Sequence, residues 1–413
     1  MKDITAFLFL YDHTMTMNQA IQSLHHLQSR LERIYILHSG KIPFEKLKEP
    51  SVVPICFIHV KDDDIGKRIN LIIADVSTPF ILFLHQNQYL AKAENVNLPK
   101  SKDVLITDEY TPVLARTSLL RKQSLPSSKL LPFPEALLHA WICNVSPLLT
   151  CRRSGLIQIS KRNKSKQWKE KQQFLQKYHQ LKSKIEGPGL SIIMANYNME
   201  KYVEIAIASS LTQIQLPEKI LVIDDGSSDS SLEKIEKWKH CPRIQMYQQK
   251  NGGKARAINA VLPHVTTEFV MELDADDWLD PDAIHVIKKH LLRLPDDVSV
   301  LYGNLRQWKQ KDREVQYQRT VKGRPISAKN FLSYPFPLGP RIYRTSYLKQ
   351  IGGFPVINFY DGRMYEDVTV LKKLMQISRL HYEDFTVYNV RKHMESITKS
   401  VKVDWKEYVQ HIN

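Results

Sequence analysis

The sequence contains no long hydrophobic run. Its longest apolar stretches, such as 80–84 and 190–195, fall far short of the roughly 20 residues that a helix needs to cross a bilayer. The N-terminus pairs Lys2 with Asp3 and lacks the apolar core and small-residue cleavage site of a secretory signal peptide. We therefore expect a cytoplasmic protein without transmembrane helices, attached at most peripherally to the inner face of the membrane.

Cysteine is also scarce. The chain has 4 cysteines among 413 residues, and they are scattered without metal-ligand spacing. A disulfide scaffold and a zinc site are thereby excluded, and we expect reduced, structural thiols. Hydrophobic residues make up 43% and charged residues 25% of the chain, which is typical of folded proteins. This length exceeds what one core usually supports, so we expect two domains.

The net charge of +16 is concentrated in one segment. Between Arg152 and Glu186 there are 11 Lys or Arg against 2 Glu, a local net of 11 − 2 = +9. Apolar residues recur there at helical spacing, namely Leu175, Tyr178, Leu181 and Ile185. We predict a basic linker over 151–188 with an amphipathic helix. It could be a solvated bridge between domains or a contact for an anionic membrane surface; no nucleic-acid partner is expected.

After Gly189 the pattern alternates between buried strands and amphipathic helices. Strands are predicted at 190–195, 219–223 and 269–273, with helices between them. Asp280 and Pro281 then suggest an N-cap and a first-turn proline for a further helix. This alternation predicts an α/β fold with a mainly parallel, Rossmann-like sheet, which binds ligands at the carboxyl ends of its strands.

Carboxylates follow these strands where such a ligand would bind. Asp224 and Asp225 end one strand, and Asp274 and Asp276 end another. Converging carboxylates are costly unless a cation or a ligand compensates their charge. Ligands that are all oxygen suit Mg²⁺ or Mn²⁺ better than Zn²⁺. Asp-Asp-Gly-Ser by itself is also a common turn sequence.

Motifs in this half resemble glycosyltransferase family 2. They are Ser191-Ile-Ile-Met-Ala-Asn-Tyr-Asn, Val222-Ile-Asp-Asp-Gly-Ser, Asn251-Gly-Gly-Lys-Ala-Arg-Ala-Ile-Asn and Leu273-Asp-Ala-Asp-Asp, in the family's order. The resemblance covers roughly 190–395. It implies a GT-A fold, a nucleotide-sugar donor, a divalent cation (Mn²⁺ or Mg²⁺) and inversion at the anomeric carbon. A P-loop is excluded, because position 248 is Gln and Lys254 precedes Ala.

The resemblance also implies roles for individual residues. Tyr197 would lie against the donor base and Asp225 would accept from its ring N–H, with uridine as the default base. Asp276 would bind the metal, with Asp274 on the ribose side. The remaining donor-side and metal candidates are Ala195, Asp224, Lys254, Asp277 and His393. Ala195 stands where relatives often carry a hydroxyl or a proline.

The base that removes the acceptor proton is predicted at Asp367, with Glu366 as the alternative. A competing interpretation makes Asp367 a charge partner for a helix N-terminus. The Gln-x-x-Arg-Trp element of polymerising relatives is absent. We therefore expect transfer of one sugar or a few.

The first half carries a partial internal repeat. Asn70 to His85 spans 85 − 70 = 15 residues, as Asn259 to Asp274 spans 274 − 259 = 15. In this register the metal-site carboxylates are lost, and Ala136 replaces Asp367. We predict a degenerate, non-catalytic GT-A-like domain at 1–150; the alternative is an unrelated α/β domain with chance similarity.

Together these patterns predict a GT-A catalytic domain at 189–395, followed by a tail at 396–413. The predicted reaction moves a hexose or N-acetylhexosamine from a UDP-sugar to a hydroxyl of a glycan or lipid-linked acceptor. Cell-surface polysaccharide, glycolipid or wall polymer synthesis is the expected context. The alternative is a non-catalytic protein that binds glycans or nucleotides and scaffolds an assembly.

Overall fold

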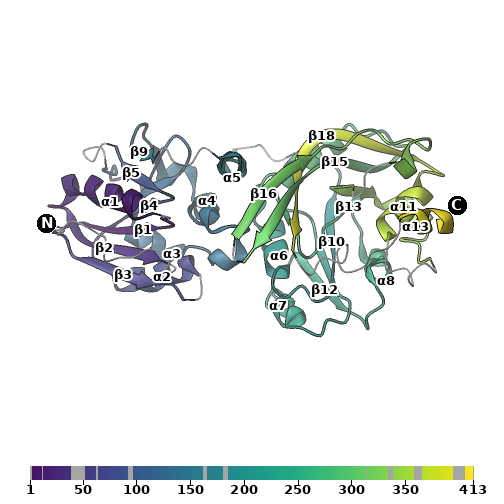
Figure 1. Ribbon diagram of the computed structural model, residues 1–413, viewed down its shortest axis with the longest axis horizontal. Helices are drawn as coiled ribbons and strands as arrows, with labels where there is room; N and C mark the ends of the chain where they lie inside the picture. Colours follow the sequence, from purple (N-terminus) through teal and green to yellow (C-terminus); the bar gives the residue numbers. More distant parts are fainter. Residues whose placement is uncertain are drawn as a thin grey trace. The chain divides into compact units, whose positions relative to one another are not determined.

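The computed structural model describes most of the chain as two compact units, Met1–His179 and Gln180–Asn413. The described residues are 2–11, 13–38, 52–61, 64–91, 96–160, 165–179, 185–312, 314–333, 338–357, 365–393 and 405–412. Figure 1 shows that each unit is built around its own sheet.

The first unit alternates strands and helices from its N-terminus. Its strands are β1 (Ile4–Phe9), β2 (Leu31–His38), β3 (Ile55–His59), β4 (Phe80–His85), β5 (Gln88–Leu90), β6 (Val104–Ile106), β7 (Pro112–Arg116), β8 (Thr150–Arg152) and β9 (Ile157–Ile159). Its α-helices are α1 (Thr14–Ser23), α2 (Ile65–Asp75), α3 (Thr117–Lys122), α4 (Leu137–Ile142) and α5 (Lys166–Gln176). The main sheet has the order β3-β2-β1-β4-β7-β6-β8. Alternate residues of β1, such as Ile4 and Leu8, pack under α1 in one hydrophobic core.

The second unit has a larger sheet, of order β12-β11-β10-β13-β17-β15-β18-β14, with β16 paired to β15. Its strands are β10 (Leu190–Asn196), β11 (Ile220–Asp224), β12 (Ile244–Gln248), β13 (Phe269–Glu272), β14 (Trp278–Leu279), β15 (Val298–Lys311), β16 (Glu314–Val321), β17 (Arg341–Arg344) and β18 (Arg379–Lys392). Its α-helices are α6 (Val203–Leu211), α7 (Ser231–Glu236), α8 (Lys254–Val261), α9 (Ala283–Leu291), α10 (Thr345–Gln350), α11 (Glu366–Leu374) and α13 (Trp405–Ile412).

Helices cover both faces of this second sheet. Ile192 of β10 packs with α6, α7 and α9 on one face. Its neighbour Ile193 points to the other face, where α8, α10, α11 and α13 contribute to the core. The predicted α/β class with mainly parallel sheets is therefore confirmed. The layering places the N-termini of α8 and α11 on the same face of the sheet.

The two main sheets share strand order and direction. In each, the first four strands of the order are parallel, and the next strand is antiparallel to its neighbour: β7 runs against β4, and β17 against β13. The sequence register aligns His85 with Asp274. His85 is the last residue of β4, and Asp274 lies just after the end of β13, the corresponding strand.

The predicted linker over 151–188 does not form one continuous element. β8 pairs with β6, and β9 pairs with β5, so residues up to 159 belong to the sheets of the first unit. α5 ends at Gln176, where Phe174 and Leu175 are buried, and Lys171 forms an ion pair with Glu135 at 2.6 Å. The apolar stripe is divided, because Leu175 and Tyr178 belong to the first unit and Ile185 to the second, while Leu181 lies outside the described residues.

Two further local expectations differ from the structure. The predicted tail at 396–413 contains α13, whose Tyr408 is 0% exposed and packs in the core of the second unit. The predicted N-cap Asp280 lies before the start of α9 and is buried, with its carboxylate bound by Arg306 and Asn389 at 2.7 Å each. In the part of the chain that the structure describes, no helix is long and apolar enough to span a bilayer.

Candidate functional site

The centre of the site is Glu272, the last residue of β13. Its carboxylate is 2% exposed and accepts two hydrogen bonds from the guanidinium of Arg341, at 2.8 and 2.9 Å. Tyr343 Oη donates to the same group at 3.1 Å. Burial would raise the pKa of Glu272, but the charges of Arg341 and Lys254 lower it to about 2. Glu272 is therefore a fixed negative charge beneath the site.

Lys254 joins this carboxylate to the predicted donor side. It is the first residue of α8, and its Nζ lies 2.7 Å from Glu272 and forms a very short ion pair with Asp274. A third carboxylate, Glu366, lies 3.6 Å away. Burial would lower the pKa of Lys254, but these carboxylates raise it well above its usual range. Lys254 thus stays a cation between donor-side and acceptor-side residues.

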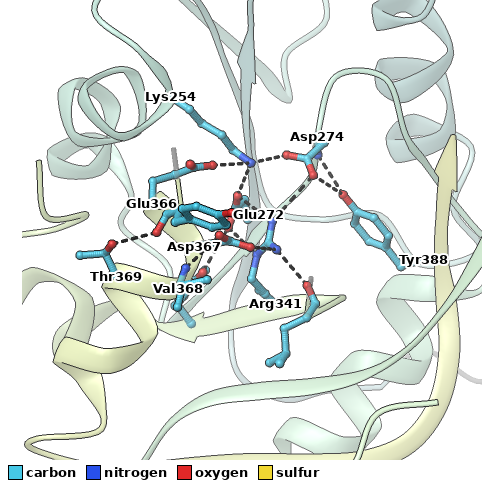
Figure 2. A network of polar contacts seen from close by, with 12 residues as sticks. Lys254, Glu272, Asp274, Arg341, Glu366, Asp367, Val368, Thr369 and Tyr388 are labelled. Carbon is cyan, nitrogen blue, oxygen red and sulfur yellow. Dashed lines mark hydrogen bonds and ion pairs between the residues drawn. The ribbon is translucent and has the colours of Figure 1, made fainter. Parts of the chain in front are cut away.

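The two predicted base candidates, Glu366 and Asp367, begin α11. Asp367 Oδ2 lies 3.4 Å from Arg341 Nη1, and its Oδ1 accepts from the backbone N–H of Val368 at 2.9 Å. Its side chain is 17% exposed, so it remains accessible to a substrate. Figure 2 shows both carboxylates directed at the cluster of Lys254, Glu272 and Arg341. The structure therefore brings Asp367 close to the end of β13 through Arg341.

An aromatic cluster holds the start of α11. The residue before the helix, Tyr365, has a left-handed backbone with φ of 57°, a strained conformation for a side chain of this size. Its ring contacts Trp405 and Tyr408 of α13, with centroids 5.3 and 4.3 Å apart. Tyr408 Oη also lies 2.7 Å from Thr369 Oγ1. α13 therefore fixes the turn that presents Glu366 and Asp367.

The contribution of Glu366 to the stability of the folded protein depends on pH. Burial raises its pKa to about 7, although Lys254 opposes the shift. Since the folded-state pKa lies above the unfolded value, the stability that this group contributes is full below about pH 4.5 and is lost as pH rises through about 7. We expect Glu366→Gln to stabilise the protein relative to wild type by about 1–3 kcal/mol more at pH 8 than at pH 5. Urea unfolding at both pH values measures this difference, and a pH-independent difference would contradict it.

Asp224 and Asp225 organise the loops around β11. Asp224 accepts from Asn196 Nδ2 at 2.8 Å and from the Ser227 hydroxyl at 2.6 Å. Asp225 accepts from the backbone N–H groups of Gly252 and Gly253, at 2.9 and 2.8 Å. The predicted convergence is thus indirect, because β10 separates β11 from β13 in the sheet. Asp225 connects to the site by holding the residue that precedes Lys254.

Loss of the Asp225 charge should loosen the start of α8. An Asn side chain offers one oxygen where the carboxylate accepts three hydrogen bonds, including one from Gln249 at 2.7 Å. We expect Asp225→Asn to lower the free energy of unfolding by about 2–3 kcal/mol, since hydrogen bonds to a buried charge are lost. Urea denaturation tests this value, with Asp297→Asn as a control at an exposed ion pair; equal midpoints for the two variants would contradict it.

The predicted base-binding residues lie at the end of β10. Tyr197 is 43% exposed, so its ring is accessible for stacking, while Ala195 is half-buried against the core. A cavity of about 250 Å³ lies farther along the same loop. It is lined by Asn198, Met199, Glu200, Lys201, Tyr202, Ser228 and Asp229.

The predicted metal ligands come together in part. Asp276 Oδ2 lies 2.9 Å from His393 Nε2, although 117 residues separate them, whereas Asp274 is occupied by Lys254. Within the described ranges, no group of three His, Cys, Asp or Glu side chains could hold a metal ion. Mg²⁺ is commonly held by one or two carboxylates together with substrate phosphates, so Asp276 and His393 fit a cation shared with a diphosphate.

Asp277 faces β18 and not the donor side. Its carboxylate is 3% exposed and accepts from the backbone N–H of Arg391 at 2.7 Å. Burial raises the pKa of Asp277 well above its usual range, and the charges of Asp276 and Asp274 add to this. Arg391 also donates to the Asp276 carbonyl at 2.9 Å. Asp277 thus fastens the Asp274–Asp277 loop to β18.

Sequence patterns missed three residues of this site. Glu272 could have been noticed as a carboxylate inside an otherwise apolar strand. Arg341 and Tyr388 carried no comparable signal, because they reach the site only through pairing of β17 and placement of β18. Tyr388 Oη lies 3.0 Å from the backbone nitrogen of Asp274 and 3.4 Å from its carboxylate (Figure 2).

The family model that matches this chain falls within the second unit. The sequence model of glycosyl transferase family 2 matches residues 191–358. Chondroitin synthase of Pasteurella multocida is 34% identical over 107 residues, which are 26% of this chain and 11% of that protein. Poly-beta-1,6-N-acetyl-D-glucosamine synthase of Staphylococcus epidermidis is 38% identical over 97 residues, 23% of each chain. The chain thus covers only a small part of these relatives.

Among solved structures, S. aureus TarS in complex with UDP-GlcNAc is 22% identical and has a TM-score of 0.41. The match covers 54% of this chain and 64% of that one. The family match begins in β10 and includes Glu272, Asp274, Asp276 and Arg341. The second unit of this protein therefore contains a glycosyltransferase family 2 domain, at residues 191–358.

Proposed function

We propose that this chain transfers a sugar from a nucleoside diphosphate sugar to a hydroxyl group, with inversion at the anomeric carbon. The observation that supports this most directly is the position of Asp367. Through Arg341 and Glu272 it is connected to Asp274, in the loop that the family uses for the donor. A base and a donor-binding loop at one end of one sheet are what direct displacement needs.

In this mechanism Asp367 accepts the proton of the acceptor hydroxyl. The hydroxyl oxygen forms a bond to the anomeric carbon from the face opposite the diphosphate, and the bond from that carbon to the phosphate oxygen breaks. Tyr197 and Asp225 hold the nucleoside, and Lys254 stabilises charge on the leaving diphosphate. Asp276 and His393 would hold a Mn²⁺ or Mg²⁺ ion, which as a Lewis acid would neutralise the same charge.

The substrate class that we propose is a UDP-hexose or UDP-N-acetylhexosamine as donor and a glycan or lipid-linked hydroxyl as acceptor. Relatives named as chondroitin, hyaluronan and poly-N-acetylglucosamine synthases support a role in polysaccharide synthesis. The alternative, a scaffold that binds glycans or nucleotides without chemistry, would not require a buried cationic network next to an accessible Asp367.

For the first unit we propose a degenerate copy without catalysis. At the end of β4, Asn87 is buried and accepts from Thr16 Oγ1 at 2.7 Å, and Gln88 accepts from the His85 backbone N–H at 3.3 Å. His85 itself is buried, and burial lowers its pKa to about 3. Asn87 and Gln88, which correspond to Asp276 and Asp277 in the repeat, are thus hydrogen-bonded within the unit.

The function is tested by incubating the full chain with a panel of nucleotide sugars and measuring release of the nucleoside diphosphate with and without Mn²⁺. We expect release with at least one UDP-sugar that depends on the metal. No release from any donor, together with no change in melting temperature on adding UDP and Mn²⁺, would overturn the proposal.

A further inference from the structure

We propose that Glu272 is the positioning residue of the site, which holds the donor-side and acceptor-side charged groups at a fixed separation. This inference rests on the proposed function, because it concerns the residues assigned to that reaction. Glu272 is too buried to touch a substrate, and it acts through the cations that it binds.

The strand pairing places Glu272 under both cations. In the antiparallel pair β13–β17, Glu272 lies opposite Arg341, so their side chains share one face of the sheet. That face is the one covered by α8 and α11. Lys254 reaches Glu272 from the start of α8, and Glu366 and Asp367 come from the start of α11. Elements from four parts of the sequence therefore join one network of ion pairs, in which Glu272 binds both cations.

Each cation bound by Glu272 bridges the two sides of the site. Lys254 contacts Asp274 on the donor side and Glu366, at 3.6 Å, on the acceptor side. Arg341 lies 3.8 Å from Asp274 and 3.4 Å from Asp367. Both bridges, drawn in Figure 2, end at Asp274 on the donor side, and Glu272 is the buried carboxylate that binds both cations. Movement of Glu272 would displace both bridges together.

Further contacts leave Glu272 and Arg341 little freedom. Arg341 Nη1 donates to the carbonyl of Leu338 at 2.9 Å, and Tyr343 Oη donates to Glu272. The planar guanidinium binds the carboxylate through two parallel hydrogen bonds, which fixes orientation as well as distance. A buried ion pair adds little to stability compared with apolar residues of similar size. Geometry is thus the better explanation for its presence beside Asp367.

The chain offers a matched control on the same two strands. Glu268 pairs with Arg344 at 2.7 Å, one residue before β13 and at the far end of β17. This pair also joins a glutamate to an arginine across β13 and β17, but it lies at the opposite ends of the strands from the site. Glu268→Gln and Arg344→Lys therefore make the same chemical changes without touching the bridges.

The experiment measures kcat, donor KM and melting temperature of the full chain for Glu272→Gln, Arg341→Lys, both controls, Asp367→Asn and the double variant Glu272→Gln/Asp367→Asn. We expect Glu272→Gln to lower kcat by about 10²-fold, since small displacements of reacting groups cost that much, with donor KM changed less than about 3-fold. Arg341→Lys keeps the positive charge but loses the paired hydrogen bonds of the guanidinium, so it should lower kcat by about 10-fold. The controls should stay within about 2-fold of wild type.

The double variant separates positioning from a merely structural role. Because the acceptor-side part of the effect of Glu272 passes through Arg341 to Asp367, the loss of activity in the double variant should be smaller than the product of the two single losses. Multiplicative losses, or a kcat for Glu272→Gln equal to that of Glu268→Gln, would overturn the inference. If Glu272→Gln does not fold, Arg341→Lys tests the inference in its place. A kcat for Arg341→Lys equal to that of Arg344→Lys would then overturn the inference. If wild type transfers no sugar from any donor, the proposed function itself fails and this inference fails with it.

Discussion

Asp367→Asn should lower glycosyl transfer by about 10²–10⁴-fold, the range that a positioned general base contributes. Asparagine keeps the size of the side chain but cannot accept the acceptor proton. Arg341 Nη1 would still have an oxygen partner near 3.4 Å, so the local structure should persist. The measurement is kcat with a nucleotide sugar that the wild type uses, at saturating donor and acceptor.

Glu366→Gln is the matched control, because it removes a carboxylate from the same helical turn. If Asp367 served only as a charge partner for the N-terminus of α11, Asp367→Asn should lower stability and leave kcat little changed. A large loss of kcat for Asp367→Asn alone would support Asp367 as the general base. A large loss for Glu366→Gln alone would transfer that role to Glu366, whose raised pKa of about 7 suits proton exchange near neutrality.

Asp276→Ala should lower metal-dependent release of nucleoside diphosphate by roughly 10²–10³-fold, comparable to loss of one electrostatic contact to a leaving group. The carboxylate lies 2.9 Å from His393 Nε2 and is 21% exposed, so it can reach a cation at the surface of the site. Without it, His393 alone remains of this contacting pair. We expect the Mn²⁺ concentration for half-maximal activity to rise as well.

Asp384→Asn provides the comparison for this second result. Asp384 is an exposed carboxylate of β18 that pairs with Lys322 at 3.1 Å, away from the end of β13. Its replacement should leave activity and Mn²⁺ dependence unchanged. If Asp276→Ala keeps full activity and the same Mn²⁺ dependence, the site does not use Asp276 to hold the metal.

Local patterns in the sequence predict much of the second unit. Apolar strands at 190–195 and 219–223 correspond to β10 and β11 within a residue or so, because hydrophobic periodicity reflects burial directly. The N-terminus of α8 follows from Gly252-Gly-Lys, where Gly253 has a φ of 88° that favours glycine. The boundaries of the linker and of the tail were not predictable, because long-range pairing of β8 and β9 and burial of Tyr408 determine them.

The residues of the candidate site were likewise predictable from the sequence only in part. Asp274, Asp276 and Asp367 could be selected from the sequence, since motifs of adjacent residues carry them. The sequence places Asp224 and Asp225 on the donor side, and in the structure Asp224 accepts from Asn196 while Asp225 accepts from the backbone N–H of Gly252. A carboxylate that binds a ligand and one that binds backbone N–H groups have the same local sequence. Only the segments that pack against each carboxylate in the folded protein distinguish the two cases.

The sequence by itself determined the class of fold, the family resemblance and the carboxylates at the strand ends, because each depends on residues within one short segment. The tertiary structure decided which charges meet. Glu272 and Arg341 are 69 residues apart, and they face each other only in the observed register of β13 and β17. A slip of one residue would turn Arg341 to the opposite face of the sheet, away from Lys254 and Asp367.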